Sequence, residues 1–266
     1  YRPIVSLCGG VPVVIETKEE NEFRLTADEL REKITDKTKL LVLPYPNNPT
    51  GAIMRREDLE AIAKVLKDTN IMIASDEIYS ELTYSGKHCS IAEIEGMRER
   101  TIVINGFSKS FAMTGWRLGF LGGPKEIVSQ MLKLHQYAIM SSPTVSQYAA
   151  IVAMHSCQKD IDAMRNEYNI RRRFVVDSFN KLGLKCFAPQ GAFYVFPCIK
   201  STGMTSTDFC EKLVYTKKVA VVPGDAFGEC GEGYVRVSYA YSLNHLREAI
   251  KRIGEFLEDI KNGNVQ

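Results

Sequence analysis

One lysine of this chain, Lys109, stands where its amine could act as a nucleophile. It follows an apolar run and has small neighbours, Gly106, Ser108 and Ala112. Because such neighbours at a strand end give the side chain little access to bulk water, we expect desolvation to lower the pKa of the ammonium group. A neutral lysine amine can form a Schiff base with an aldehyde.

Arg117, eight positions after Lys109, indicates what that aldehyde carries. A guanidinium group is a planar fork that binds phosphate oxygens in two places. A Schiff-base lysine followed by a phosphate-binding arginine is typical of a pyridoxal phosphate site. The residues therefore point to pyridoxal 5'-phosphate as the cofactor, with Lys109 as the catalytic residue.

Asp76 directly follows an apolar run, and two interpretations apply. A lone aspartate at such a place is most often a helix N-cap, but it can also be a buried charge that needs a cation. A pyridinium nitrogen would supply the cation, and the carboxylate would keep that nitrogen protonated so that the ring accepts electrons. Tyr79, three residues on, would present its hydroxyl to the phenolate oxygen if the segment turns helically.

Two further polar residues have alternative interpretations. Asn48 lies in a loop of three prolines and a glycine at residues 44–51, which either turns the chain rigidly or presents the Asn48 amide to a phenolate oxygen. Arg236 alternates with Val235 and Val237, so it projects from the opposite face. It is either a surface arginine on an edge strand or a fork that grips a substrate carboxylate in two places.

The elements that position these residues follow from the hydrophobic pattern. Four short apolar runs suit strands buried on both faces of a largely parallel sheet: residues 40–43, 71–74, 101–104 and 118–121. Helical patterns accompany them, one opened by a capping box at Thr26–Glu29 and one over residues 55–67. This alternation predicts an α/β fold with a mostly parallel sheet flanked by helices and with the site at the carboxyl ends of the strands.

The second half of the chain follows another pattern. Helices are predicted at residues 125–137, 144–155 and 160–181, the last with Gly183 as its C-cap. Four strands and two helices then form a smaller α+β unit, the strands at 184–187, 193–196, 219–222 and 235–239 and the helices at 206–217 and 244–261. We therefore expect a large cofactor-binding domain at 1–158 and a small C-terminal domain at 159–266 that includes the long interdomain helix.

Composition argues against several classes of protein. The net charge is +2 and neither sign forms long blocks, so we expect neither a nucleic-acid nor a membrane partner. Seven scattered cysteines without a C-x-x-C pair make a disulfide scaffold or a metal site unexpected and favour the reducing cytoplasm. The four histidines match no motif, and none is assigned a role.

Four ordered motifs together resemble the class I/II aminotransferases, which are pyridoxal-phosphate enzymes of fold type I. Residues 106–119 match the family's lysine attachment pattern, and residues 48–51 match its N-P-T-G element. Asp76 and Tyr79 fall on its D-x-x-Y element, and residues 223–238 contain its C-terminal signature. Order and spacing agree over essentially the whole chain, so the combination is far more specific than any single motif.

The resemblance implies a role for each of these residues. Lys109 would carry the Schiff base and move the substrate proton. The remaining cofactor contacts would be Asp76 at the pyridine nitrogen, Asn48 and Tyr79 at the phenolate oxygen, and Arg117 with Ser108 at the phosphate. Arg236 would bind the substrate α-carboxylate. The expected reaction moves an amino group between an L-amino acid, of the aspartate or aromatic type, and a 2-oxo acid.

The chain departs from the family at its amino end. Family members are longer there and carry a glycine-rich phosphate turn, an aromatic ring that stacks on the pyridine and a tyrosine lent to the partner subunit. We expect a fragment, with a large domain that lacks its amino-terminal part, which binds the cofactor weakly and turns over poorly alone. The family also implies a homodimer.

Other functions stay open at this point. A carbon–sulfur lyase of the same fold would use the same Lys109 and Asp76, because the cofactor carries the hard step. An aminotransferase-like sensor domain of a transcription regulator would follow a basic winged-helix segment, and none is visible here. A non-catalytic remnant conflicts with the intact set of Lys109, Asp76 and Arg236. No second arginine can be placed at a side-chain pocket, so the amino donor is not decided.

Overall fold

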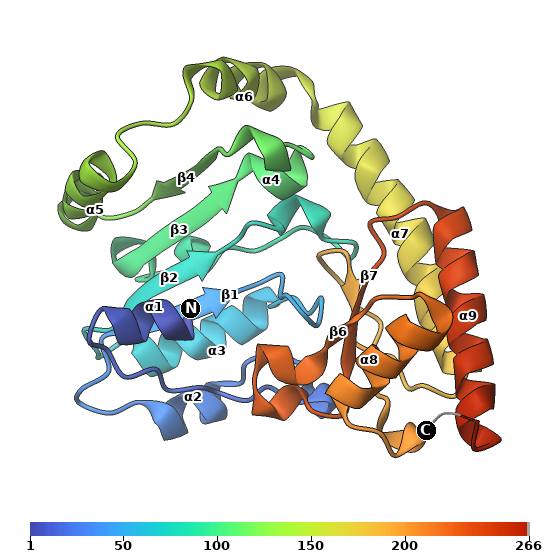
Figure 1. Ribbon diagram of the computed structural model, residues 1–266. Helices are drawn as coiled ribbons and strands as arrows, with labels where there is room; N and C mark the ends of the chain where they lie inside the picture. The colour runs from blue at the N-terminus through green and yellow to red at the C-terminus, as the bar shows by residue number, and fades with distance from the viewer. Residues whose placement is uncertain (265–266) are drawn as a thin grey trace.

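The computed structural model describes residues 1–264, and its first half is built on a four-stranded sheet (Figure 1). The strands are β1 (Leu40–Pro44), β2 (Met72–Asp76), β3 (Thr101–Gly106) and β4 (Gly119–Gly122), in the order β1-β2-β3-β4. The first three are parallel, and β4 is antiparallel to β3. The chain between β3 and β4 holds only short helical turns and no crossover helix, so it returns antiparallel.

The predicted helices of this half are present. Helix α2 (Ala27–Lys33) begins with the predicted capping box, in which the Thr26 hydroxyl accepts from the Glu29 amide and the Glu29 carboxylate accepts from the Thr26 amide. Helix α3 (Arg56–Leu66) buries Leu59, Ile62, Ala63 and Leu66 against the core below the sheet. Two short helices complete this half, α1 (Arg2–Leu7) and α4 (Phe107–Ser110).

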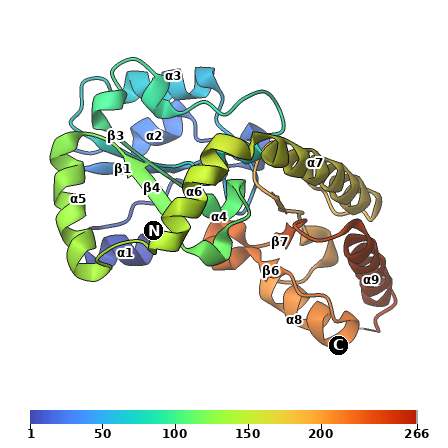
Figure 2. The same cartoon turned by 90° about the horizontal axis from the view of Figure 1, so that it is seen from above.

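Three helices connect the first sheet to the second part of the chain. Helices α5 (Lys125–Ala138) and α6 (Thr144–Ser156) lie beyond β4, and α7 (Gln158–Lys181) runs from the end of α6 to the second unit (Figures 1 and 2). All three occur where the sequence predicts them. Gly183 follows α7 with φ +82°, a backbone conformation that glycine adopts without strain.

The second sheet has three short antiparallel strands in the order β5-β7-β6: β5 (Tyr194–Val195), β6 (Val222–Pro223) and β7 (Val235–Ser238). Helices α8 (Ser206–Lys217) and α9 (Leu243–Lys261) pack on it and share its core with α7. Of the strand predicted at 219–222, only Val222 lies in β6, because only Val222 and Pro223 pair with β7.

Two expectations about this unit are wrong. Residues 184–187 form no strand, because the Asn180 side chain takes the backbone groups of Cys186 instead: its Oδ1 accepts from the Cys186 amide at 3.0 Å and its Nδ2 donates to the Cys186 carbonyl at 3.3 Å. The edge-strand interpretation of Arg236 is also wrong, since β7 is the central strand of its sheet. Arg236 is half-buried there.

The two units touch through the segment before α2. The Phe23 ring packs edge-on against Phe187, Phe196 and Tyr234, with ring centroids 5.6 to 6.2 Å apart. The Glu19 carboxylate accepts from the Tyr234 hydroxyl at 3.2 Å and lies 3.1 Å from the Lys185 ammonium. These contacts set the small sheet against the carboxyl ends of the large one. Within residues 1–264, no helix is both long enough and apolar enough to cross a bilayer.

Candidate active site

The parallel strands of the first sheet bring three predicted site residues to one edge. Pro44 pairs with Asp76, and Asp76 pairs with Ile104, so β1 and β2 end at the same level and β3 continues beyond them to Gly106. Asn48 lies in the loop that follows β1, Asp76 is the last residue of β2, and Lys109 lies in α4 directly after β3. The carboxyl edge of this sheet is therefore where the predicted side chains gather.

Gly51 joins the Asn48 loop to the second unit. Its φ is +70°, and a Cβ on it would lie 2.3 Å from the Cβ of Pro189, so only glycine fits. Its carbonyl accepts from the amides of Gln190 and Gly191, at 3.0 and 2.8 Å. Strand β5 starts at Tyr194, three residues after Gly191. This connection places the Tyr194 side chain at the edge of the large sheet.

Asp76 is half-buried and has only neutral hydrogen-bond partners in the part of the chain that the structure describes. One carboxylate oxygen accepts from the Ile78 amide at 3.2 Å, as a local capping interaction does, and the other accepts from the Tyr1 hydroxyl. The helix N-cap interpretation is wrong, because the next helical turn, Ser80–Leu82, has Tyr79 as its N-cap. The interpretation as a charge that needs a cation stays a prediction. A carboxylate at this edge with no ion-pair partner in residues 1–264 suits a protonated ring nitrogen.

Tyr79 and Arg236 meet at a third residue, Tyr194. The hydroxyls of Tyr79 and Tyr194 lie 2.9 Å apart, and both side chains are buried. The Arg236 guanidinium carbon is 4.6 Å from the centre of the Tyr194 ring and 4.9 Å from that of Phe227. Burial, and then the hydrogen bond with Tyr194, raise the pKa of Tyr79 above its ordinary value, so its hydroxyl keeps its proton at neutral pH.

Arg236 keeps one edge of its guanidinium fork without a partner. Its Nη1 donates to the Asn48 Oδ1 at 2.9 Å, which leaves the Asn48 Nδ2 free to donate elsewhere. Its Nε is buried and has no acceptor among the described residues. A buried donor without an acceptor is unfavourable by about 1–3 kcal/mol, and a carboxylate would relieve that cost. The donor set fits an anionic group at this position.

Lys109 is half-buried against the second unit. Its Nζ lies 5.7 Å from the centre of the Phe193 ring, and that ring meets Tyr79 almost perpendicularly at 5.4 Å. The small residues expected around Lys109 shield it only in part, because Ala112 is exposed. The Phe193 ring supplies the apolar surface beside the amine. Sequence reasoning missed Phe193 and Tyr194, although it predicts the strand that carries them.

Ser108 and Arg117 are held by one turn and lie apart from this aromatic cluster. The Thr114 hydroxyl donates to the Ser108 carbonyl, and the Arg117 Nη1 donates to the Thr114 carbonyl, each at 2.8 Å. Arg117 itself has φ +51° and an exposed side chain, with no acidic partner in the described part of the chain. Without an acidic partner, the remaining donors of this exposed guanidinium are accessible to a phosphate group.

The structure adds a buried acid beside Asp76. Glu77 is 5% exposed and accepts hydrogen bonds from the hydroxyls of Ser75 and Ser90, at 2.8 and 2.6 Å. Its other oxygen lies 2.9 Å from the His88 Nε2. Burial alone would raise the pKa of Glu77. The hydrogen bond and the charge of His88, together with the hydrogen bonds from Ser90 and Ser75, bring that pKa below its ordinary value. No sequence motif connects Glu77 to His88, eleven residues away.

This network predicts an acid-sensitive fold. The folded-state pKa of Glu77 lies below its ordinary value of 4.5, so its contribution to stability is present above that pH and is lost as the pH falls through the folded-state value. We expect Glu77→Gln to lower the free energy of unfolding by about 1–3 kcal/mol at pH 7 and to flatten its dependence on pH below 4.5. Urea titrations at several pH values measure both effects. Equal slopes for the two proteins would contradict the assignment.

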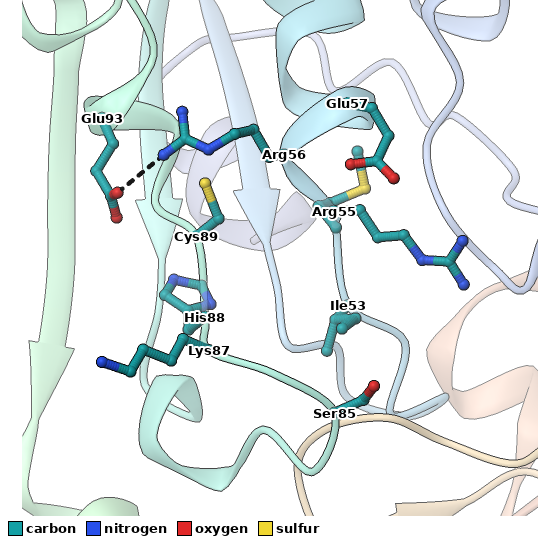
Figure 3. A pocket seen from close by; sticks show the side chains of 10 residues that line it. Ile53, Arg55, Arg56, Glu57, Ser85, Lys87, His88, Cys89 and Glu93 are labelled. Atoms are coloured by element: carbon teal, nitrogen blue, oxygen red, sulfur yellow. Dashed lines mark hydrogen bonds and ion pairs between the residues drawn. The ribbon is translucent and has the colours of Figure 1, made fainter.

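The structure also holds an open pocket of about 520 Å³ (Figure 3). It sits beside the start of α3, and three of its lining side chains already have partners: Arg56 pairs with Glu93, Arg55 with Glu22, and His88 with Glu77. None of the predicted site residues lines it. Within residues 1–264 there is also no group of histidine, cysteine and acidic side chains that could hold a metal ion.

Known proteins are similar to this chain over nearly its whole length. The family model described as aminotransferase class I and II matches residues 1–253. The aspartate aminotransferase of Pyrococcus abyssi is 48% identical over 264 residues, which cover 98% of this chain and 68% of that protein. The aromatic-amino-acid aminotransferase 2 of Thermococcus litoralis is equally similar, with the same coverage.

Solved structures give the same result. The aromatic aminotransferase from Pyrococcus horikoshii superimposes with a TM-score of 0.96 at 47% identity, over 98% of this chain and 71% of that one. The aspartate aminotransferase from Thermus thermophilus with maleate superimposes with a TM-score of 0.91 at 37% identity, over 96% of this chain and 66% of that one. The chain spans about two thirds of the length of these relatives.

Proposed function

Because the chain belongs to the class I and II aminotransferase family, we propose that its amino donor is an L-amino acid of the aspartate or aromatic type and its acceptor a 2-oxo acid. The family's members are pyridoxal-phosphate enzymes of fold type I, and transamination is the activity of this chain's relatives. The choice of donor is supported by two of the relatives at 48% identity, one an aspartate and one an aromatic-amino-acid aminotransferase.

The observation that carries the proposal is the unpartnered fork of Arg236 next to the Lys109–Phe193–Tyr79 cluster. In this assignment Arg236 holds the substrate α-carboxylate through Nε and Nη2. That grip directs the α-carbon toward Lys109, whose amine takes the proton from this carbon and returns it at the next step. When bound, the cofactor supplies the electron sink for the charge left on that carbon.

The other residues hold the cofactor in this proposal. The Asp76 carboxylate keeps a proton on the pyridine nitrogen, and the Tyr79 hydroxyl and the Asn48 Nδ2 donate to the phenolate oxygen. Arg117, with Ser108, holds the phosphate. Two of these assignments have direct support at the carboxyl edge of the first sheet: the Asn48 Nδ2 is free to donate, and Asp76 has no ion-pair partner among the described residues.

Organisation and location are also proposals. We assign residues 1–158 to the large domain and residues 159–266 to the small one. A homodimer is supported by apolar side chains exposed on α5 and α6: Leu132, Leu134, Tyr137, Val145, Tyr148, Ile151, Val152 and Met154. A cytoplasmic location is supported by the seven free cysteines.

A spectrum of the purified chain with added pyridoxal phosphate, followed by borohydride reduction and peptide mapping, tests the proposal. We expect a visible band and a reduced adduct on Lys109, because reduction traps a lysine that has formed a Schiff base. An adduct confined to other lysines, or no adduct, would overturn the assignment. The same titration checks the expected weak binding by these 266 residues, which saturation at equimolar cofactor would contradict.

An amino-acceptor assay separates transaminase from lyase. With aspartate or an aromatic amino acid as donor, we expect the acceptor 2-oxo acid to be converted into its amino acid at the rate at which the donor is consumed. Release of a thiol from a cysteine conjugate without acceptor consumption would favour the lyase instead.

A further inference from the structure

Tyr194 lies where the proposed cofactor contact and the proposed substrate contact meet. Its side chain is 7% exposed and projects from β5. Its hydroxyl lies 2.9 Å from that of Tyr79, and its ring lies under the Arg236 guanidinium at 4.6 Å. No motif of the sequence assigns it a role. Through this side chain, β5 contacts both Tyr79, in the turn that follows β2, and Arg236, on β7.

The hydroxyl pair has a defined direction once an anion is bound. A tyrosine hydroxyl has one proton to donate, and it can also accept. When the Tyr79 hydroxyl donates its hydrogen bond to a phenolate oxygen, it cannot also donate to Tyr194. The hydrogen bond between the two tyrosines then requires Tyr194 to be the donor. Tyr194 has no other hydrogen-bond partner in the described residues, so its proton is available for this purpose. Hydrogen bonds in such a chain polarise one another, which makes Tyr79 a stronger donor.

The ring of Tyr194 acts on the other contact. The Arg236 guanidinium lies near both the Tyr194 and the Phe227 rings, and its Nη1 is held by Asn48. Cation–π contact with the two rings and the hydrogen bond to Asn48 restrict the rotation of the fork. Pairing of Tyr194 with Ser238 and of Val195 with Val237 ties the two strands together, so the ring and the fork move as one body.

We propose that Tyr194 is a positioning residue: its hydroxyl orients the Tyr79 proton toward the cofactor's phenolate oxygen, and its ring orients Arg236 toward the substrate carboxylate. This inference rests on the proposed function, because it takes Tyr79 and Arg236 in those two roles. It predicts that the two effects of Tyr194 separate on mutation, since one depends on the oxygen and the other on the ring.

The test compares Tyr194→Phe with Tyr194→Leu. The phenylalanine variant keeps the ring, so we expect the pH midpoint of the visible band of the cofactor-loaded protein to rise by about 0.3–1 pH unit, with the KM for the amino donor nearly unchanged. A weaker donor to the phenolate oxygen stabilises its negative charge less, which favours the protonated form. The leucine variant should show this shift and also raise the KM about 3–30-fold.

Tyr168→Phe is the matched control. Tyr168 packs on Phe193 in the same aromatic cluster, at 5.7 Å between ring centres, but its hydroxyl has no bond to Tyr79. We expect its pH midpoint to equal that of the unmodified chain. An unchanged midpoint in Tyr194→Phe, or an equal shift in Tyr168→Phe, would overturn the inference and leave the proposed function intact. Absence of any visible band in the unmodified chain would instead reject the proposed function. If Tyr194→Leu fails to fold, the phenylalanine variant still decides the role of the hydroxyl.

Discussion

Replacement of Lys109 by alanine should lower kcat by at least about 10⁴-fold, because in the proposed function this lysine is both the nucleophile and the base that moves the substrate proton. The half-buried amine lies 5.7 Å from the Phe193 ring, so no neighbouring side chain of that cluster can take its place: Phe193 and Tyr194 offer no amine, and Tyr79 keeps its proton. Steady-state rates measured with saturating donor, acceptor and pyridoxal phosphate give the size of the loss.

Two controls separate chemistry from folding. Lys64→Ala changes an exposed lysine on α3 and should leave kcat within about twofold. Surface substitutions away from the core and the site change the stability of a protein very little. A small primary amine added to Lys109→Ala should restore part of the proton-transfer rate, because the deleted side chain leaves space beside Phe193. Activity of Lys109→Ala close to that of the unmodified chain, in the absence of added amine, would refute the role of Lys109.

Strands and helices could be predicted well from the sequence because their signals are local. The runs that form β1, β2 and β3 are apolar throughout, so their positions agree with the structure to within two residues. The capping box at Thr26 depends on two side chains three residues apart, and both of its hydrogen bonds form. Elements whose signals lie within one turn or one strand need no tertiary information.

The failures depend on contacts that lie outside the hydrophobic pattern of the segment itself. Residues 184–187 have an apolar pattern, but the Asn180 side chain satisfies the Cys186 backbone, and a neighbouring strand is not needed. The central place of β7 depends on the strand order, which a single strand's alternation does not encode. The Glu77–His88 contact joins residues eleven positions apart, and no sequence motif links the two.

The candidate site divides in the same way. Types and spacing predicted Asn48, Asp76, Tyr79, Lys109 and Arg236, whose roles stay predictions. What the sequence could not give is their contacts: Arg236 with Asn48, across 188 positions, and Tyr79 with Tyr194, across 115. Phe193 and Tyr194 looked like ordinary strand residues, because their importance comes from the second unit lying against the edge of the first sheet.

Replacement of Arg236 by lysine should raise the KM for the amino donor about 10–100-fold, with a smaller fall in kcat. Lysine keeps the positive charge but loses the two-point grip of Nε and Nη2, and it no longer fills the space between the Tyr194 and Phe227 rings. Because the buried Nε has no protein acceptor in residues 1–264, the loss should fall on the ligand rather than on the fold.

A thermal unfolding midpoint of Arg236→Lys within a few degrees of that of the unmodified chain would show that the loss falls on binding and not on the fold. Replacement of a mainly structural arginine would destabilise the protein as much as it weakens binding. Arg247→Lys is the matched control, because Arg247 is exposed on α9 and, within residues 1–264, its side chain bonds only to Asn244. An unchanged KM in Arg236→Lys would place the substrate carboxylate elsewhere. In that case the main role of Arg236 would be its hydrogen bond to Asn48. Loss of that bond should then shift the visible band of the bound cofactor and leave the KM unchanged.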